Sequence, residues 1–244
     1  MPVRGGLNTS GAGIGILVLD TRFPRIVGDI GNARTFPFPV VYRRVPMASS
    51  DRVVRQGDPA LLPAFIEGAQ ELERDGVKAI TTSCGFLAKF QCELAAAVRV
   101  PVFTSSLLQV PLVGRMLAPG RAVGILTISA GSLGAEHLLA VGIAPDIPLV
   151  IGGTEGEKEF TQAILDDRPE LDVETARADV VRAAKRLVDE HPEVGAIVLG
   201  CTNMPPYRAD IQQATGLPIF DVVTLVSAVH SALAHSLPPL SVMP

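Results

Sequence analysis

Short runs of β-branched and aliphatic residues alternate along this chain with longer segments that have helical periodicity. The runs occupy Ile14–Leu19, Val40–Val45, Val77–Thr81 and Val100–Phe103 in the first half, and Ala122–Ile128, Leu149–Ile151, Ala196–Leu199 and Leu217–Phe220 in the second. Apolar runs of this length are typical of strands that are buried on both faces. The alternation therefore predicts an α/β fold, with short parallel sheets flanked by helices.

Helical patterns fill most of the gaps between these runs. In Pro59–Asp75, apolar side chains recur every three or four residues from Leu62 to Leu72, and charged side chains occupy the other face. This spacing is that of an amphipathic helix. Val173–Glu190 is predicted to form a long helix, and Val222–Leu233 an apolar helix that packs against another element.

The second half of the chain repeats the first. Val77-Lys-Ala-Ile-Thr-Thr-Ser-Cys84 aligns without a gap on Val194-Gly-Ala-Ile-Val-Leu-Gly-Cys201, and at the same offset of 117 residues Val100-Pro-Val-Phe103 falls on Leu217-Pro-Ile-Phe220. A repeat of this length is too long for a solenoid and indicates duplicated lobes. We predict two pseudo-symmetric lobes, residues 1–117 and 118–220, with the active site in the cleft between them and a C-terminal helix over residues 221–236 that packs back on the first lobe.

Composition narrows the classes of function and partner. The chain has 244 residues, of which 48% are hydrophobic, and a formal net charge of −4, so no broad basic face is expected for DNA or RNA. The three cysteines do not suggest a disulfide framework and fit a reducing compartment. Since the apolar run Ile14–Leu19 is too short for a secretory core or a membrane span, we expect a cytoplasmic protein without a membrane partner.

Cys84 and Cys201 each follow an apolar strand and precede a helix, which places them at the edge of a parallel sheet where α/β folds bind ligands. If the lobes face one another, the two thiols approach a shared cleft from opposite sides. That arrangement suits proton removal by one sulfur and proton return by the other. A free thiol has a pKa of about 8.5, and the helix N-termini are expected to lower it. Cys92 has no counterpart in the repeat and is assigned to core packing.

The motifs Gly200-Cys-Thr-Asn-Met-Pro205 and Thr81-Thr-Ser-Cys-Gly-Phe86 resemble those of the aspartate/glutamate racemase superfamily, the Asp/Glu/hydantoin racemase family. By this resemblance Ser83, Gly85, Thr202 and Asn203 hold a substrate carboxylate, Gly85 through its amide. Hydroxyl and amide donors at helix N-termini are suited to an anion.

The loop after the first strand of each lobe faces the same cleft. It offers Asp20 or Arg22 in the first lobe and Thr127, near Ser129, in the second, and of these Asp20 and Thr127 are our candidate substrate contacts. Asp29 lies between glycines, a pattern typical of a turn.

The resemblance implies a cofactor-independent isomerase: a racemase or epimerase of a small amino acid or related carboxylate that transfers protons between Cys84 and Cys201. The alternative is a decarboxylase, lyase or cis-trans isomerase that uses one cysteine, because arylmalonate decarboxylases, dimethylsulfoniopropionate lyases and maleate isomerases share the architecture, as do hydantoin racemases. Gly85, Phe86 and Asn203 differ from the residues typical of glutamate racemases, which argues against that substrate.

A third reading is a carboxylate-binding protein without turnover. The four histidines show no metal-ligand spacing, so neither a metal nor a cofactor is expected. The partner expected is a small carboxylate substrate, and a homodimer is expected by resemblance.

Overall fold

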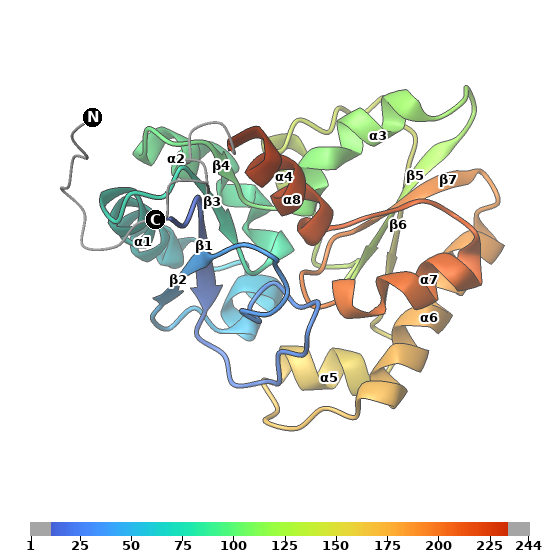
Figure 1. Cartoon of the computed structure of the whole chain (residues 1–244). Helices are drawn as coiled ribbons and strands as arrows, with labels where there is room; N and C mark the ends of the chain where they lie inside the picture. The colour runs from blue at the N-terminus through green and yellow to red at the C-terminus, as the bar shows by residue number, and fades with distance from the viewer. Residues whose placement is uncertain (1–10, 234–244) are drawn as a thin grey trace, which may run out of the picture.

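The computed structural model describes residues 11–233 and contains, within that range, two four-stranded parallel sheets (Figure 1). The first consists of β1 (Ile14–Leu19), β2 (Val40–Val45), β3 (Ala79–Thr82) and β4 (Val102–Phe103), in the order β2-β1-β3-β4. The second consists of β5 (Ala122–Thr127), β6 (Leu149–Gly153), β7 (Val194–Leu199) and β8 (Ile219–Phe220), in the order β6-β5-β7-β8. The identical strand orders confirm the predicted α/β fold of two similar parallel sheets.

Helices connect and cover the strands. They are α1 (Leu62–Arg74), α2 (Gln91–Ala97), α3 (Val110–Met116), α4 (Ala135–Ala140), α5 (Glu159–Leu165), α6 (Val173–Glu190), α7 (Arg208–Thr215) and α8 (Val222–Leu233), with shorter helical turns at 51–55, 59–61, 85–90, 106–109 and 205–207. The central strands β1, β3, β5 and β7 are almost wholly buried, because helices lie on both faces of each sheet. Apolar runs rather than alternating patterns are what such strands require.

The outer strands β4 and β8 are shorter than predicted, and the chain shows why. Pro101 and Pro218 stand directly before them, and proline has no N–H to donate to a neighbouring strand. Both prolines still serve the sheets as acceptors: Pro101 O accepts from Ile80 N, and Pro218 O from Ile197 N, each at 2.9 Å.

The last described helix, α8, packs on the first sheet although it follows the second in sequence. Its Val222 and Val226 belong to one apolar cluster with Ile14, Ile16 and Phe103. The predicted lobe boundary near residue 117 stays a prediction, and positions 234–236 of the predicted C-terminal helix lie outside the described residues.

The long loop between β1 and β2 leaves the first lobe and crosses to the second, where Figure 1 shows it near α5 and α7. Asp167, between α5 and α6, accepts hydrogen bonds from the backbone N–H of Arg22 at 2.6 Å and of Phe23 at 3.2 Å. Gly28 lies so close to Pro206 that a Cβ would be 2.7 Å from its Cα, with a φ of +103° that glycine tolerates best. This loop therefore closes one side of the space between the lobes.

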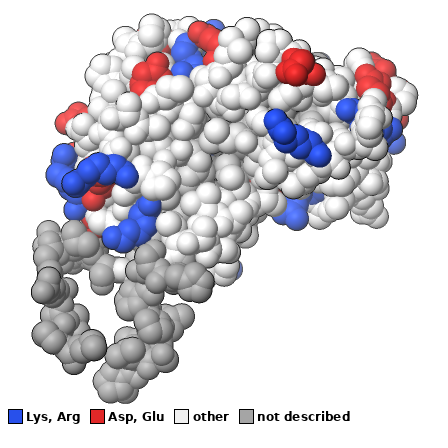
Figure 2. All heavy atoms as spheres, turned by 90° about the horizontal axis from the view of Figure 1, so that it is seen from above, with Lys and Arg blue, Asp and Glu red and all other residues white. Residues whose placement is uncertain are grey.

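Charges of both signs are interspersed on one face of the molecule. In the face seen in Figure 2, Lys and Arg side chains lie among Asp and Glu on a largely uncharged background. None of the helices between residues 11 and 233 is long and apolar enough to cross a membrane.

Candidate active site

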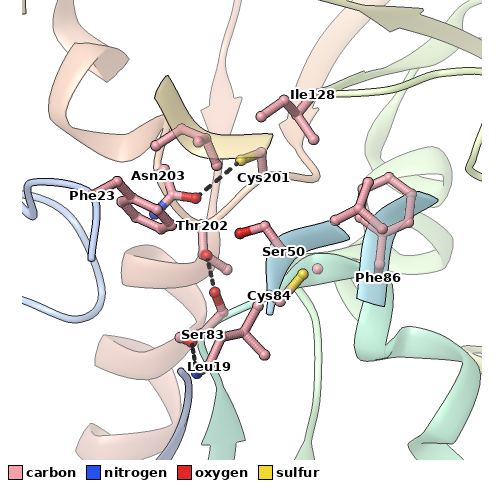
Figure 3. Close-up of a pocket in the computed structure, with 13 residues that line it drawn as sticks. Leu19, Phe23, Ser50, Ser83, Cys84, Phe86, Ile128, Cys201, Thr202 and Asn203 are labelled. Carbon is pink, nitrogen blue, oxygen red and sulfur yellow. Dashed lines mark hydrogen bonds between the residues drawn. The ribbon is translucent and has the colours of Figure 1, made fainter. Parts of the chain in front are cut away.

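A small cavity lies between the two lobes, where β1 and β3 of one sheet and β5 and β7 of the other end (Figure 3). Its lining comprises two thiols, three hydroxyls, one carboxamide, one glycine and six apolar side chains: Cys84, Cys201, Ser50, Ser83, Thr202, Asn203, Gly85, Leu19, Phe23, Val54, Phe86, Ile128 and Ile164. No Asp, Glu, Lys, Arg or His side chain is part of this lining. The cavity is thus an apolar space with a few polar groups, as small-molecule sites are.

The two cysteines of the repeat meet in this cavity. Cys84 follows β3 and Cys201 follows β7, and only 8% and 6% of their surfaces are exposed. In Figure 3 their side chains lie on opposite sides of Ser50. A charge on Cys84 raises the pKa of Cys201, so the two sulfurs are near enough to influence each other.

Burial controls the acidity of both thiols. It raises the pKa of Cys84 to about 11, although the backbone N–H groups of Phe86 and Leu87 and the charge of Arg25 act in the opposite direction. Burial also raises the pKa of Cys201, against a lowering by the backbone of Asn203. The N–H donors expected at the start of each helix are present, but the loss of hydration of a thiolate outweighs them.

The two lobes touch through the residues that flank the cysteines. Thr202 Oγ1 donates to Ser83 O at 2.6 Å. In the repeat, Gly85 is equivalent to Thr202, and Gly200 is equivalent to Ser83. Gly85 and Gly200 also touch, so closely that a Cβ on Gly85 would come within 1.7 Å of the Gly200 carbonyl oxygen. These two contacts are equivalent in the repeat, with a hydroxyl in one and bare backbone in the other.

Two serines place hydroxyls at the cavity. Ser83 Oγ accepts from Leu19 N at 3.0 Å, which leaves its proton free to point at a ligand. Ser50 is buried, lines the cavity and makes no side-chain capping bond to the turn Asp51–Arg55. Ser50 was not among the site residues predicted from the sequence. Its position five residues after the end of strand β2 was the available signal.

A chain of polar contacts leads from Cys201 to a buried ion pair. Cys201 Sγ donates to Asn203 Oδ1 at 3.5 Å, and Asn203 Nδ2 donates to Asp29 Oδ2 at 2.6 Å. Asp29 Oδ1 in turn accepts from Arg25 Nη1 at 2.9 Å and from Gly31 N at 2.7 Å. The side chains of Arg25 and Asp29 are only 14% and 3% exposed. Asp29 is therefore more than a turn residue, and neither it nor Arg25 was among the predicted site residues.

The cavity brings together six of the predicted site residues: Cys84, Cys201, Ser83, Gly85, Thr202 and Asn203. Asp20 is not in its lining and binds Arg44 Nη1 at 3.0 Å and Met47 N at 3.3 Å. Thr127 is also outside the lining, and its buried Oγ1 has no hydrogen-bond partner among the described residues. The predicted contacts of these side chains with substrate stay predictions.

The prediction for Cys92 was wrong. It is exposed, and its Sγ lies 3.8 Å from Ala140 O, because the first turn of α2 presents it to solvent beside α4 rather than to the core. Within residues 11–233 no cluster of three or more His, Cys, Asp or Glu side chains is placed to hold a metal ion.

Comparisons with known proteins agree with this fold. The family model described as Asp/Glu/Hydantoin racemase matches residues 40–229. A dimethylsulfoniopropionate lyase of Durusdinium sp. clade D is 31% identical over 223 residues, covering 88% of this chain and 73% of the relative. Dimethylsulfoniopropionate lyase 7 of Emiliania huxleyi is 31% identical over 229 residues, covering 90% and 67%. The structure of Picrophilus torridus aspartate racemase superposes with a TM-score of 0.58 at 16% identity, covering 91% of this chain and 95% of that one.

These relatives correct one sequence-based prediction. The chain was expected to be an isomerase, whereas the curated relatives that match nearly its whole length are named lyases. The likeness to the aspartate racemase, at 16% identity, shows the fold alone. Lyase chemistry was the alternative reading of the sequence, and it is the one that these relatives support.

Proposed function

The chain belongs to the Asp/Glu/hydantoin racemase family, and from this premise we propose that it is a lyase that eliminates a neutral leaving group from a small β-substituted carboxylate. The substrate class proposed is that of the relatives, a 3-sulfoniopropionate such as dimethylsulfoniopropionate. In the reaction a base removes a proton from the carbon next to the carboxylate. The electron pair forms the carbon–carbon double bond of acrylate, and the carbon–sulfur bond breaks with its pair remaining on sulfur, which releases dimethyl sulfide.

The lining of the cavity is the observation that carries this proposal. An α-amino acid brings an ammonium group that needs a carboxylate partner when buried, and no Asp or Glu side chain lines the cavity. A sulfonium propionate lacks that group. Its methyl groups can lie on apolar and aromatic surface such as Phe86 and Ile128, since weakly hydrated cations bind aromatic faces. A sulfonium group also leaves as a neutral molecule, so no acid is needed to protonate it.

The two thiols are unequal, which suits a one-way elimination. Cys201 donates its proton to Asn203 Oδ1, whereas the equivalent position after Cys84 is Phe86, whose side chain accepts no conventional hydrogen bond. We assign Cys84 as the base that removes the α-proton, with Cys201 kept as a neutral thiol. Hydroxyls of Ser50 and Ser83 are the proposed donors to the substrate carboxylate. A single thiolate beside that carboxylate limits like-charge repulsion.

The test is release of dimethyl sulfide. Purified protein is incubated with dimethylsulfoniopropionate, dimethyl sulfide is measured in the headspace by gas chromatography, and acrylate is measured by NMR. Cys84→Ser is expected to lower kcat by about 10²- to 10⁴-fold, the usual contribution of a general base. Cys92→Ser, which changes an exposed thiol outside the cavity, is the matched control and should retain full activity.

Two results would contradict the proposal. One is the absence of both dimethyl sulfide and acrylate with the folded wild-type protein at substrate concentrations in the millimolar range. The other is undiminished elimination by Cys84→Ser, which would remove the assigned base from the mechanism.

A further inference from the structure

The Asn203 side chain is fixed in one orientation by its partners. An Asn amide has a donor end and an acceptor end, and the choice between them follows from the groups that each end meets. Asp29 Oδ2, 2.6 Å from Asn203 Nδ2, belongs to a carboxylate that is ion-paired with Arg25 and can only accept. The amide nitrogen must therefore face Asp29, and the carbonyl oxygen must face Cys201.

This orientation favours the protonated form of the Cys201 thiol over the thiolate. A carbonyl oxygen 3.5 Å away accepts a proton from a thiol but repels a thiolate. The charged or titratable groups that act on this sulfur are Cys84, Asp29 and Arg25. Asp29 and Cys84 disfavour a negative charge on Cys201, and Arg25 favours it while being neutralised by Asp29.

The Arg25 side chain is itself fixed by contacts on several sides. Its ion pair with Asp29 therefore keeps the Asp29 carboxylate directed at Asn203. Arg25 Nη2 donates to Thr21 Oγ1 at 3.0 Å, and its guanidinium lies 4.6 Å from the centre of the Phe23 ring. A Cβ on Gly31 would come within 2.4 Å of the Arg25 side chain, so the loop folds tightly around it. Asp29 receives a further bond from Gly31 N.

We propose that Arg25 and Asp29 are positioning residues that orient the Asn203 amide and thereby hold Cys201 as a neutral hydrogen-bond donor, so that Cys84 alone serves as the base. This inference deepens the proposed function, on which its catalytic meaning rests. The equivalent position to Asn203 in the first lobe is Phe86, so no such device acts on Cys84. At this position the similarity of the two lobes is thus broken by the Asn203 side chain together with the loop that orients it.

The experiment replaces the Asp29 carboxylate, which can only accept hydrogen bonds, with an amide that can also donate them. In Asp29→Asn the new amide can donate to Asn203, which allows Asn203 to turn and present its own N–H groups to Cys201. The full-length protein is alkylated with iodoacetamide over a range of pH, without substrate, and each cysteine is followed by mass spectrometry of its peptide. The midpoint of the pH profile separates ionisation from accessibility, since only the thiolate reacts.

The expected result is a fall of at least one pH unit in the Cys201 midpoint, equivalent to about tenfold faster alkylation at pH 8, with the Cys84 midpoint unchanged. Asp29→Glu retains the carboxylate and should restore the wild-type Cys201 midpoint. Asn203→Ala removes the acceptor without altering Asp29 and should also lower the Cys201 midpoint, which keeps the inference testable if Asp29→Asn does not fold. Alkylation of the exposed Cys92 serves as an internal reference for the activity of the reagent in every sample.

An unchanged Cys201 midpoint in both Asp29→Asn and Asn203→Ala would overturn the inference. Equal shifts of Cys84 and Cys201 would also overturn it, because they would indicate general loosening of the cavity. The measurement is independent of turnover. A protein that releases no dimethyl sulfide yet shows the Cys201 shift refutes only the proposed lyase function, and an active lyase without the shift refutes only the role of Asp29.

Discussion

At the scale of single residues, the character of the site depends on what surrounds each sulfur rather than on the cysteines alone. Both thiols are buried, and the pKa of each is raised because a thiolate loses its hydration there. These two thiols are therefore protonated at neutral pH. In the proposed elimination, turnover draws on the small fraction of molecules in which Cys84 is ionised.

The first prediction concerns pH. Because the raised pKa of Cys84, about 11, lies well above neutrality, the thiolate population grows as pH rises. The value of kcat/KM for elimination should increase by about tenfold per pH unit between pH 7 and pH 9, as expected for a base that is mostly protonated. Initial rates of dimethyl sulfide release in buffers of constant ionic strength measure this. A profile that is flat or falls over that range would show that a different group acts as base.

The second prediction concerns the close approach of the lobes at Gly85. In Gly85→Ala the new methyl group would meet the Gly200 carbonyl oxygen at 1.7 Å, and backbone cannot yield as a flexible side chain can. The free energy of unfolding should fall by about 3 kcal/mol or more, and activity should be lost with it. Gly131→Ala is the matched control, since a Cβ there meets nothing within 4 Å and should change stability by less than about 0.5 kcal/mol.

Both glycine variants are compared by urea unfolding followed by circular dichroism. Equal stability of the Gly85 and Gly131 variants would mean that the lobes can separate at this contact without cost.

At the scale of elements, α5 shows how a helix is held against the cavity that it helps to line. Its Ile164 side chain is part of the lining. The start of α5 is fixed by Asp179 of the neighbouring helix α6, whose Oδ2 accepts from Glu159 N at 2.8 Å and from Phe160 N at 3.0 Å. A carboxylate at this place satisfies two of the N–H groups that a helix leaves unpaired, and it complements the helix dipole.

The third prediction follows from this cap. Asp179→Ala leaves two N–H groups of α5 without their acceptor in a largely buried place, and the free energy of unfolding should fall by about 3 kcal/mol. The KM for the substrate should rise because α5 carries Ile164. Asp189→Ala changes an exposed carboxylate on the same helix and serves as the control. Thermal unfolding and initial-rate kinetics test both variants, and identical behaviour of the two would contradict this account of α5.

At the scale of the whole molecule, the site exists only because two lobes and one crossing loop meet. Thr202 of the second lobe binds Ser83 of the first, and Ser106 Oγ donates to Leu199 O at 2.6 Å across the same junction. The crossing loop brings Phe23 into the cavity lining, and Asp167 of the second lobe anchors it.

The fourth prediction compares two ways of weakening this anchor. Asp167→Ala removes the acceptor of both backbone N–H groups of Arg22 and Phe23 and should raise KM several-fold, since Phe23 loses its fixed place. Arg22→Ala removes only an ion pair in which the arginine side chain is 76% exposed, which is worth at most about 1 kcal/mol, and should leave KM nearly unchanged. Initial-rate kinetics at two salt concentrations measure both, and a larger effect of Arg22→Ala would be the opposite of this expectation.

Much of the architecture could be predicted from the sequence, because strands buried on both faces and amphipathic helices leave local patterns. The limits of β1, β2 and α6 agree with the apolar and helical patterns of their segments, and the offset repeat correctly indicated two similar sheets. The repeat also indicated that Cys84 and Cys201 lie at the cavity, since a strand followed by a turn fixes where a residue lies relative to its own sheet.

Only the tertiary structure decided which distant residues share the cavity. Asn203 and Asp29 are 174 positions apart, and no local pattern records that the β1–β2 loop crosses to the other lobe. The same holds for Ser50 and for the exposure of Cys92, because the surroundings of a side chain depend on neighbouring elements. Periodicity thus set the elements and the positions of the thiols, whereas their raised pKa values and their unequal partners arise from burial and contacts that form only when the chain is folded.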